Sequence, residues 1–211
     1  GPEGMAPIES WSSLGEQAGE SLGMSVASAG DVDADGYSDI IVGAPFHDNG
    51  QADEGAAFVF LGSSSGPSVA PDWMAESDQA GARLGWRVGS AGDVNGDGFS
   101  DVIVGAPYYR QLLSSNAGVA AVWRGSNLGL GANGTLANAD WKAQGIQADC
   151  QFGRAVGTAG DVNGDGYGDV VIGAPYYDDG QTDEGGIFLW YGSASGLGAD
   201  GTAATADWRA H

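Results

Sequence analysis

The sequence predicts an all-β protein built of three repeated units, and three observations lead to this prediction. One long pattern recurs three times along the 211 residues. Each unit contains short apolar runs rich in β-branched and aromatic residues, bounded by glycine, proline or aspartate. No segment shows the sustained 3.6-residue apolar periodicity of an amphipathic helix. Together these features favour short strands joined by tight turns.

Each unit begins at a tryptophan and keeps a fixed spacing through its first part. A glutamine, a glycine, the first aspartate of an acidic loop and a Gly-Ala-Pro triplet follow in this order. The anchors are Trp11, Gln17, Gly23 and Asp31; Trp73, Gln79, Gly85 and Asp93; and Trp141, Gln147, Gly153 and Asp161. Because such a period marks a repeat architecture, we predict units at 11–72, 73–140 and 141–207. Residues 1–10 form a lead that begins with what resembles a cloning remnant, and 208–211 form the C-terminal end.

Two candidate strands stand out in every unit. They cover residues 40–42, 102–104 and 170–172, and then 57–61, 119–123 and 187–191. Several short strands in a unit of this length favour one small antiparallel sheet per unit, stacked radially as the blades of a β-propeller. We therefore expect three four-stranded blades. Propellers close with about four to eight blades, so three blades predict either part of a longer propeller or a homodimer that completes a six-bladed ring.

The charge and the cysteine content restrict the function. The formal net charge is −21, from 28 acidic and 7 basic residues, which argues against nucleic acid and anionic lipid as partners and favours bound cations. No apolar run approaches the roughly 18 residues needed to cross a bilayer, so we expect no membrane insertion. The single cysteine, Cys150, excludes an intrachain disulfide.

An acidic loop of the form DxDxDGxxD, with asparagine allowed at position three, provides the candidate metal ligands. The predicted ligands are Asp31, Asp33, Asp35, Tyr37 and Asp39; Asp93, Asn95, Asp97, Phe99 and Asp101; and Asp161, Asn163, Asp165, Tyr167 and Asp169. Carboxylates at alternate positions of a tight turn can point to one centre, and position seven offers its backbone carbonyl. This density of hard oxygen ligands selects calcium, so we predict three Ca²⁺ sites. The first loop, with four aspartates, should bind most tightly.

Three alternatives to this metal loop are less consistent with the sequence. A single loop of this kind is often a solvated acidic turn, but three matches in fixed register favour metal binding. An EF-hand and a cellulosomal dockerin both require an acidic residue at position twelve. That position holds Val42, Val104 or Ile172, inside an apolar run. The closing ligand is instead expected to be the aspartate at position nine.

Several further residues have a structural and a functional interpretation. The unit tryptophans, together with Trp208, could stack on sugars, but their equal spacing favours packing between blades. Acidic groups recur at 48–54 and 178–184, where a solvated loop is favoured over an accessory ion site. Asn133 begins a glycosylation sequon. His47 and His211 are the two histidines, and neither recurs in the repeats, so we expect no catalytic residues and no enzyme.

The conserved elements together resemble the FG-GAP repeat of the integrin α-subunit propeller. They are the Leu-Gly or Phe-Gly pair, the acidic loop and the Gly-Ala-Pro triplet, and the resemblance covers nearly the whole chain. The pairs are Leu22-Gly23, Leu84-Gly85 and Phe152-Gly153. The resemblance implies a loop between two strands of a blade, with calcium on one face of the propeller and partner proteins on the opposite face.

By this resemblance, the chain is expected to be a secreted or cell-surface module for cell adhesion or protein interaction, in which calcium is structural. The ligand, protein or glycan, is not assigned. One alternative is a carbohydrate-binding lectin that uses the loop aromatics Tyr108, Tyr109, Tyr176 and Tyr177. Another is a non-catalytic propeller attached to a secreted enzyme.

Overall fold

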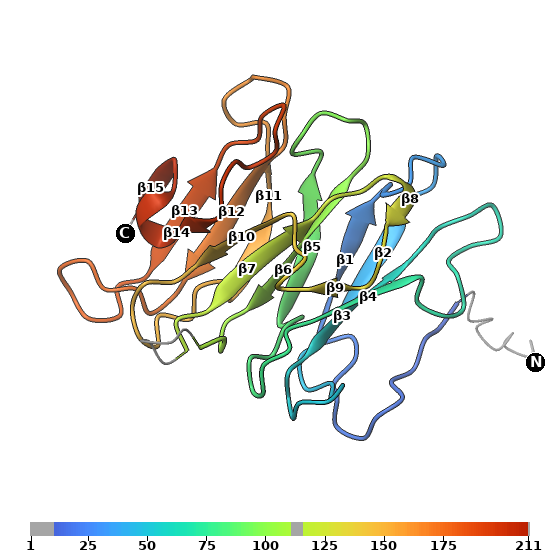
Figure 1. Cartoon of the computed structure of the whole chain (residues 1–211), viewed down its shortest axis with the longest axis horizontal. Coiled ribbons are helices and arrows are strands. Elements are labelled where there is room, and N and C mark those ends of the chain that lie inside the picture. The colour runs from blue at the N-terminus through green and yellow to red at the C-terminus, as the bar shows by residue number, and fades with distance from the viewer. Residues whose placement is uncertain (1–10, 111–115, 211) are drawn as a thin grey trace, which may run out of the picture.

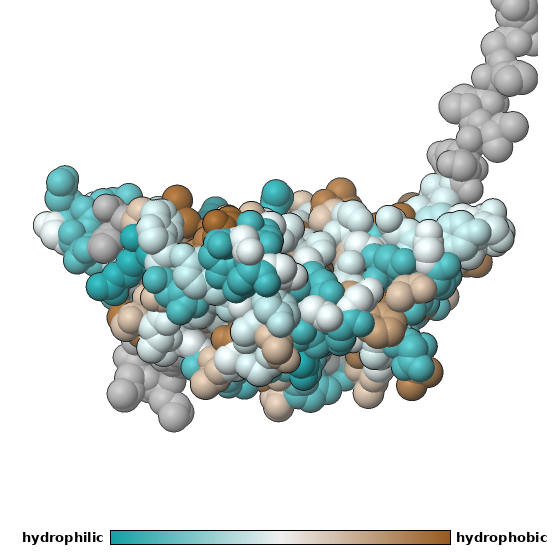
Figure 2. Space-filling view, turned by 90° about the horizontal axis from the view of Figure 1, so that it is seen from above, coloured by the Kyte–Doolittle hydropathy of each residue, from teal (hydrophilic) through white to brown (hydrophobic). Residues whose placement is uncertain are grey.

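The computed structural model describes residues 11–110 and 116–210. The predicted lead at 1–10, His211, and most of the loop that replaces the second acidic group in the middle unit lie outside these residues. The described residues fold into three β-sheets that lie side by side, with their first strands next to one another (Figure 1). The predicted all-β fold of propeller blades is therefore confirmed. Seen from above, the visible surface mixes hydrophilic and near-neutral residues with smaller hydrophobic patches (Figure 2).

The first sheet is an antiparallel meander with a short addition at its outer edge. Its order is β1-β2-β3-β4-β9. The strands are β1 (Ser25–Gly30), β2 (Asp39–Ala44), β3 (Ala56–Phe60), β4 (Trp73–Glu76) and the two-residue β9 (Gly134–Thr135). β9 pairs with β4 in parallel, whereas the other neighbours are antiparallel. The sheet thus consists of four main strands, and the short strand β9 at its outer edge comes from a later part of the chain.

The second and third sheets repeat this plan. The second, in the order β5-β6-β7-β10-β14, contains β5 (Arg87–Gly92), β6 (Asp101–Ala106), β7 (Val119–Trp123), β10 (Trp141–Gln144) and β14 (Gly201–Thr202). The third, in the order β11-β12-β13-β15, contains β11 (Ala155–Gly160), β12 (Asp169–Ala174), β13 (Gly186–Trp190) and β15 (Trp208–Ala210). A short strand β8 (Asn127–Leu130) and a 3₁₀ turn η1 (Ala203–Thr205) lie in connections. Within the described residues, no helix is long and apolar enough to span a membrane.

The sheets are offset from the predicted sequence units. The tryptophan that begins the second unit, Trp73, lies on β4 and pairs with Val59 of β3, so it completes the first sheet. Trp141 completes the second sheet in the same way. Each chain connection therefore crosses from the outer edge of one blade to the inner strand of the next. The units 11–72, 73–140 and 141–207 remain a prediction about the sequence repeat, and the blades follow a different division.

The hydrophobic core lies between the blades. One cluster joins the face of the first blade that carries Ile41 and Val59 to the face of the second that carries Val104. The other cluster joins Ile103 and Val122, on the opposite face of the second blade, to the third blade. A blade therefore buries both of its faces only when it has a neighbour on each side.

Candidate metal centre

Each acidic loop connects the first strand of a blade to its second strand. The loops cover residues 31–39 between β1 and β2, 93–101 between β5 and β6, and 161–169 between β11 and β12. In all three blades, the register shifts by one residue just before the loop, which marks a β-bulge. A bulge bends the strand and increases its twist. The three loops therefore begin from the same local geometry.

The first aspartate of each loop closes the turn through backbone hydrogen bonds. The carboxylate of Asp31 accepts the N–H groups of Asp35 at 3.1 Å and of Gly36 at 2.9 Å. Asp93 and Asp161 accept the equivalent pairs of bonds in the other loops. The glycine at position six has φ between 91° and 94° in all three copies, a conformation that side chains disfavour. This explains why the pattern requires glycine there.

The ninth aspartate is buried and ties the loop to a distant turn. Asp39 is 1 % exposed, and Asp101 and Asp169 are 0 % exposed. The Asp39 carboxylate accepts the N–H of Val32 at 2.7 Å and that of Gly62 at 2.8 Å. Both other copies make the equivalent two bonds. Because Gly62 follows the third strand, whose last residue Phe60 pairs with Ile40, this aspartate connects the loop to the turn after β3 at the same end of the blade.

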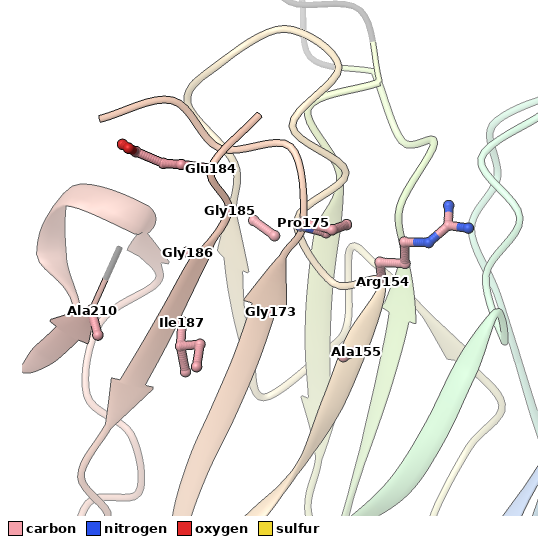
Figure 3. A pocket seen from close by; sticks show the side chains of 10 residues that line it. Arg154, Ala155, Gly173, Pro175, Glu184, Gly185, Gly186, Ile187 and Ala210 are labelled. Carbon is pink, nitrogen blue, oxygen red and sulfur yellow. The ribbon is translucent and has the colours of Figure 1, made fainter. Parts of the chain in front are cut away.

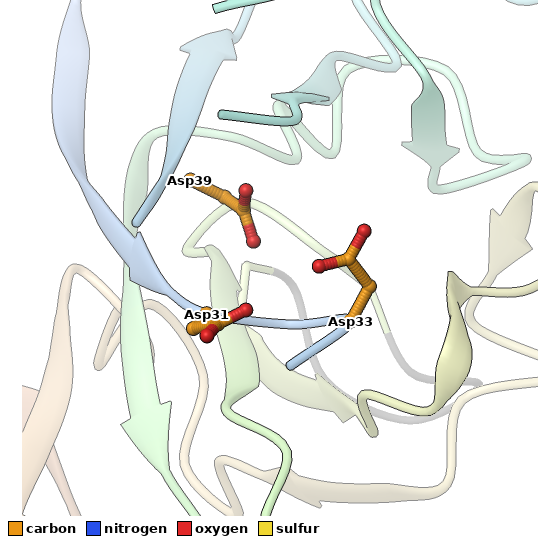
Figure 4. Close-up of side chains that lie close together, drawn as sticks. All are labelled: Asp31, Asp33 and Asp39. Atoms are coloured by element: carbon orange, nitrogen blue, oxygen red, sulfur yellow. The ribbon is translucent and has the colours of Figure 1, made fainter. Parts of the chain in front are cut away.

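Three of the predicted ligands in the first loop converge on a common space. The carboxylates of Asp31, Asp33 and Asp39 offer oxygen atoms that all lie within 4.8 Å of one another. Figure 4 shows them directed toward the same point from the loop and from the start of β2. Asp35 does not belong to this group, and its carboxylate accepts the N–H of Tyr37 at 2.9 Å. The first loop therefore brings together positions one, three and nine of the pattern.

The second and third loops differ at position three. The side-chain amide of Asn95 donates to Asp97 at 2.8 Å, and that of Asn163 donates to Asp165 at 2.8 Å. Each of these loops thus has one carboxylate fewer. In the part of the chain that the structure describes, the first loop alone gathers three carboxylate, histidine or cysteine ligands. Phe99 and Tyr167, at position seven, donate their N–H groups to position five as Tyr37 does.

Burial of the ninth aspartate makes its charge costly in the second loop. Burial raises the pKa of Asp101 to about 7, and the carboxylates of Asp97 and Asp93 act in the same direction. The N–H groups of Val94 and Gly125 oppose this shift because they stabilise the carboxylate. A bound divalent cation would favour the ionised carboxylate in the same way, and more strongly.

The first loop shows the same electrostatic cost. Burial raises the pKa of Asp39, and it also raises the pKa of Asp33, where the carboxylates of Asp35 and Asp31 add to the shift. Carboxylates this close repel one another when all are ionised. The oxygen-only donor set and this repulsion both fit a hard divalent cation.

The acidic loops are also hydrogen-bonded from blade to blade. Ser100, in the second loop, donates its N–H to the carbonyl of Asp31 in the first loop at 2.9 Å. Gly168, in the third loop, donates to the carbonyl of Asp93 in the second loop at 2.7 Å. The loops therefore form a continuous row along one side of the blades, and order in one loop constrains the next.

The glutamine of each unit has a role that the sequence did not reveal. Gln79 donates its side-chain amide to the carbonyl of Arg110 at 3.0 Å and accepts the N–H of the same residue at 2.6 Å. Gln17 and Gln147 make the same pair of bonds with Asp48 and Asp178. Each glutamine thus clamps the loop that follows the second strand of a blade. The signal in the sequence was its constant position six residues after the tryptophan.

The unit tryptophans pack between blades. The ring of Trp73, on the first blade, meets that of Trp123 on the second at 5.4 Å, and Trp141 meets Trp190 at 5.3 Å. The indole N–H of Trp73 also donates to Ala132 at 2.9 Å across the same boundary. The prediction of packing between blades is confirmed for these two positions.

The recurring acidic groups at 48–54 and 178–184 bond within their own loops. Asp48 accepts the N–H of Asp53 at 2.7 Å, and Asp178 accepts that of Asp183 at 2.6 Å. Glu54 is fully buried and accepts the N–H of Asn49 at 2.7 Å. These contacts fit the structural interpretation of the groups.

Comparison with known proteins identifies the repeat. The FG-GAP repeat family matches residues 22–60, 85–123 and 152–190. The chain is 32% identical over 163 residues to integrin alpha-PS5 of Drosophila melanogaster, a match that covers 76% of this chain and 16% of that protein. It is 30% identical over 178 residues to integrin alpha-V of Gallus gallus, covering 84% and 16%, respectively.

A relative of a different kind also matches. Phosphatidylinositol-glycan-specific phospholipase D of Mus musculus is 38% identical over 116 residues, which are 54% of this chain and 14% of that protein. In each of these three comparisons, the matched region spans at most 16% of the relative.

Proposed function

The chain belongs to the FG-GAP repeat family, and on this premise we propose that it is a calcium-binding extracellular module for adhesion or protein interaction, of the integrin α propeller type. Calcium has a structural role in this proposal. The observation that carries it is the convergence of the Asp31, Asp33 and Asp39 carboxylates within 4.8 Å. The fold repeats the same loop in the next two blades.

The donor set favours calcium over other metals. Each loop offers side-chain oxygens at positions one, three, five and nine and a backbone carbonyl at position seven, without sulfur or imidazole. Calcium accepts six to eight such oxygens in flexible geometry, whereas magnesium requires a smaller octahedral shell and retains its waters. In this proposal, the side chains at positions one and nine hold the ion and are themselves held by backbone N–H groups.

The magnitude of the calcium effect suits an extracellular setting. Extracellular calcium modules bind with dissociation constants of about 10⁻⁴ to 10⁻³ M. At a constant near 10⁻⁴ M, about 1 mM calcium stabilises the fold by about 1.4 kcal/mol per site. Three sites would then contribute about 4 kcal/mol, a large share of the roughly 5–15 kcal/mol that stabilises a typical domain. With the secreted or cell-surface location that we propose, the fold would therefore depend on calcium.

Calcium titration calorimetry tests the sites. The Asp33→Asn variant gives the first loop the same position three as the other two loops. We expect three bound calcium ions in both proteins and a loss of the tightest step in the variant. The matched converse change, Asn95→Asp, should tighten a second site. If the first loop binds no tighter than the others in the wild type, the proposed order of affinities is wrong.

Relatives that carry the name integrin alpha support a binding role over catalysis. The loops that connect the second and third strands differ in sequence from one unit to the next. Each is anchored by a glutamine clamp, so it can present a well-ordered surface to a partner. We propose that the partner is an extracellular protein and that the calcium loops support this surface without contacting the partner.

A binding assay with immobilised chain tests the interaction function. Extracellular matrix proteins and a glycan array would be applied in 1 mM calcium and again in EDTA. The proposal predicts protein binding that is lost in EDTA as the fold loosens. Sugar binding that is lost on Tyr176→Ala would instead favour a lectin, because Tyr176 is 41% exposed whereas Tyr177 is 7% exposed.

A non-catalytic propeller attached to a secreted enzyme is a second candidate. The observation in its favour is the similarity to the phospholipase D, over about half of the chain. An assay of the isolated chain for hydrolysis of a phosphatidylinositol-glycan would find no activity if the chain is such an appendage. Hydrolysis would contradict both candidates.

A further inference from the structure

The outer face of the third blade carries an open hollow of about 770 Å³. It lies beside β12 and β13, and its lining includes Gly173, Gly185, Ile187 and Ala210. Figure 3 shows Ile187 and Ala210 on neighbouring strands beside this space, whereas Arg154 points away toward the second blade. The guanidinium of Arg154 lies 5.2 Å from the Trp86 ring.

The other two blades show what fills the equivalent hollow. On the first blade, the isolated bridge between Gly55 and Leu84 seats the Leu-Gly pair of the next unit. A side chain on Gly43 would lie only 2.0 Å from the carbonyl oxygen of Gly85. The second blade repeats this contact, where a side chain on Gly105 would lie 1.9 Å from the carbonyl oxygen of Gly153. Two glycines per blade thus form a socket for the Leu-Gly or Phe-Gly pair of the following blade.

On the third blade, Gly173 and Gly185 form the equivalent socket, and none of the described residues fills it. A side chain on Gly173 would meet only its neighbour Ala155, at 3.3 Å. Ile187, which lines the hollow, is 48% exposed, and Trp208, further along the neighbouring strand β15, is 49% exposed. At the position equivalent to Ile187 on the second blade, Ala120 is 0% exposed. The third blade therefore leaves exposed a surface that the other blades bury.

The opposite end of the chain carries the matching pair. Leu22 and Gly23 precede the first blade, as Phe152 and Gly153 precede the third. Gly23 has φ +88°, against +84° for Gly153. Both glycines donate an N–H to the second strand of their own blade. Leu22 is half-buried and Gly23 is exposed, whereas Phe152 and Gly153 are buried. The first blade thus presents an unused copy of the pair that fills the sockets.

We propose that two copies of this chain associate head to tail, with the Leu22-Gly23 pair of one copy in the Gly173–Gly185 socket of the other. The interface repeats one that the chain already forms twice within itself. If both ends of each copy are engaged, two copies form a closed ring of six blades, within the range of about four to eight that propellers adopt.

One position is shared by two tryptophans. Trp11 packs on Phe60 with ring centroids 5.2 Å apart and donates its indole N–H to Ser68 at 2.9 Å. Trp73 makes the equivalent contacts at the boundary between the first two blades. Trp208 occupies the same place in the repeat at the other end of the chain. In the associated pair, the place beside Phe60 is filled either by Trp11 of the same copy or by Trp208 of the other copy. The contact between Gly23 and the Gly173–Gly185 socket is the same in both arrangements.

Sedimentation or light scattering in calcium and physiological salt, over a range of concentrations, tests the association. We expect the mass to rise from the 21.2 kDa of one chain to twice that value. The Gly173→Ala variant should stay at the mass of one chain. In the free blade the added methyl meets only Ala155, at 3.3 Å, which a small shift relieves, whereas it collides with a docked glycine backbone. Gly157→Ala is the matched control, on the adjacent strand, where a side chain meets nothing within 4 Å. It should associate like the wild type.

A mixing experiment tests the head-to-tail direction. Leu22→Glu should block the pair while leaving the socket intact, so that neither this variant nor Gly173→Ala associates with itself. A mixture of the two retains one intact pair and one intact socket, and its mass should double. Melting curves and calcium titration of each variant show whether it is folded.

Two results would overturn the proposal. In the first, the wild type stays at 21.2 kDa at all concentrations, and the socket then belongs to another occupant, such as a further blade. In the second, folded Gly173→Ala associates as well as Gly157→Ala does, and the interface then lies elsewhere.

Discussion

Asp39, Asp101 and Asp169 show how a single residue type serves both the fold and the proposed metal site. Each is buried and accepts two backbone N–H groups, one from its own loop and one from the turn after the third strand. Carboxylate oxygens have further lone pairs, so these bonds leave capacity for a cation. The sequence predicted a metal ligand at this position, and the structure adds a role in joining the loop to the blade.

The pKa of Asp101 predicts how pH affects the metal-free protein. Burial raises this pKa from 3.8 to about 7, so the folded state binds the proton more tightly than the unfolded state does. The associated stability is present below about pH 4 and is lost as the pH rises toward 7, by about 1.4 kcal/mol for each pKa unit. In EDTA, the melting temperature should therefore fall between pH 5 and pH 8.

The Asp101→Asn variant isolates this effect. It should lose part of the pH dependence, whereas Glu16→Gln, which removes one exposed charge, should behave like the wild type. An unchanged slope in Asp101→Asn would show that the general repulsion of the acidic chain causes the trend. Added calcium should weaken the decline, because it binds the ionised carboxylate.

At the scale of elements, the glutamine clamp is the feature with the clearest energetic consequence. Gln79 makes two hydrogen bonds to Arg110, and an intramolecular hydrogen bond contributes about 0.5–1.5 kcal/mol. Gln79→Ala should lower the free energy of unfolding by about 1–2 kcal/mol in urea denaturation. Gln147→Ala should cost a similar amount, because its clamp has the same geometry.

Gln51→Ala provides the control for these two variants. This exposed glutamine lies in a loop of the first blade outside the repeated clamp positions, so its replacement should change stability by less than about 0.5 kcal/mol. If Gln79→Ala and Gln51→Ala are equally mild, the clamp does not stabilise the blade.

Some strands could be predicted from the sequence and others could not. The second and third strands of each blade are rich in valine, isoleucine and aromatic residues, and the predicted ranges lie in or overlap the observed strands. The first strands, β1, β5 and β11, contain mainly alanine, glycine, serine and threonine with one valine each. Small residues suit them because these strands contact one another between blades. That requirement comes from tertiary packing and leaves no apolar run in the sequence.

The place of the acidic loop and its tight turn could be predicted, because the motif is local. The structure brings positions one, three and nine of the first loop together, whereas Asp35 lies outside that group. Positions one to nine are close in sequence, and the glycine at position six marks the reversal. The clamp partner of Gln79 lies 31 residues away, and the partner of Trp73 lies 50 residues away on the next blade. The clamp depends on how the strands of one blade are arranged, and the tryptophan contact depends on the stacking of two blades. The sequence therefore indicated only that these residues recur.

At the scale of the whole molecule, the acidic loops act along the seam between blades. The hydrogen bonds from Ser100 to Asp31 and from Gly168 to Asp93 link the three loops in a row, while the apolar core fills the space between the sheets. Calcium in one loop should therefore stabilise the contact with the next blade. Removing the metal should weaken all three blades together.

Thermal unfolding with and without calcium tests this role of the loops most directly. At 1 mM calcium, each site contributes about 1.4 kcal/mol, so three sites contribute about 4 kcal/mol. In a chain of this size, 1 kcal/mol corresponds to about 2–4 °C. The melting temperature should therefore rise by about 8–16 °C in one cooperative transition. Magnesium at equal concentration should give a smaller rise. The triple variant Asp31→Asn, Asp93→Asn, Asp161→Asn, which removes the charge at position one of each loop, should give none. A wild-type melting temperature that does not change with calcium would contradict the proposal that these loops are calcium-dependent struts between the blades.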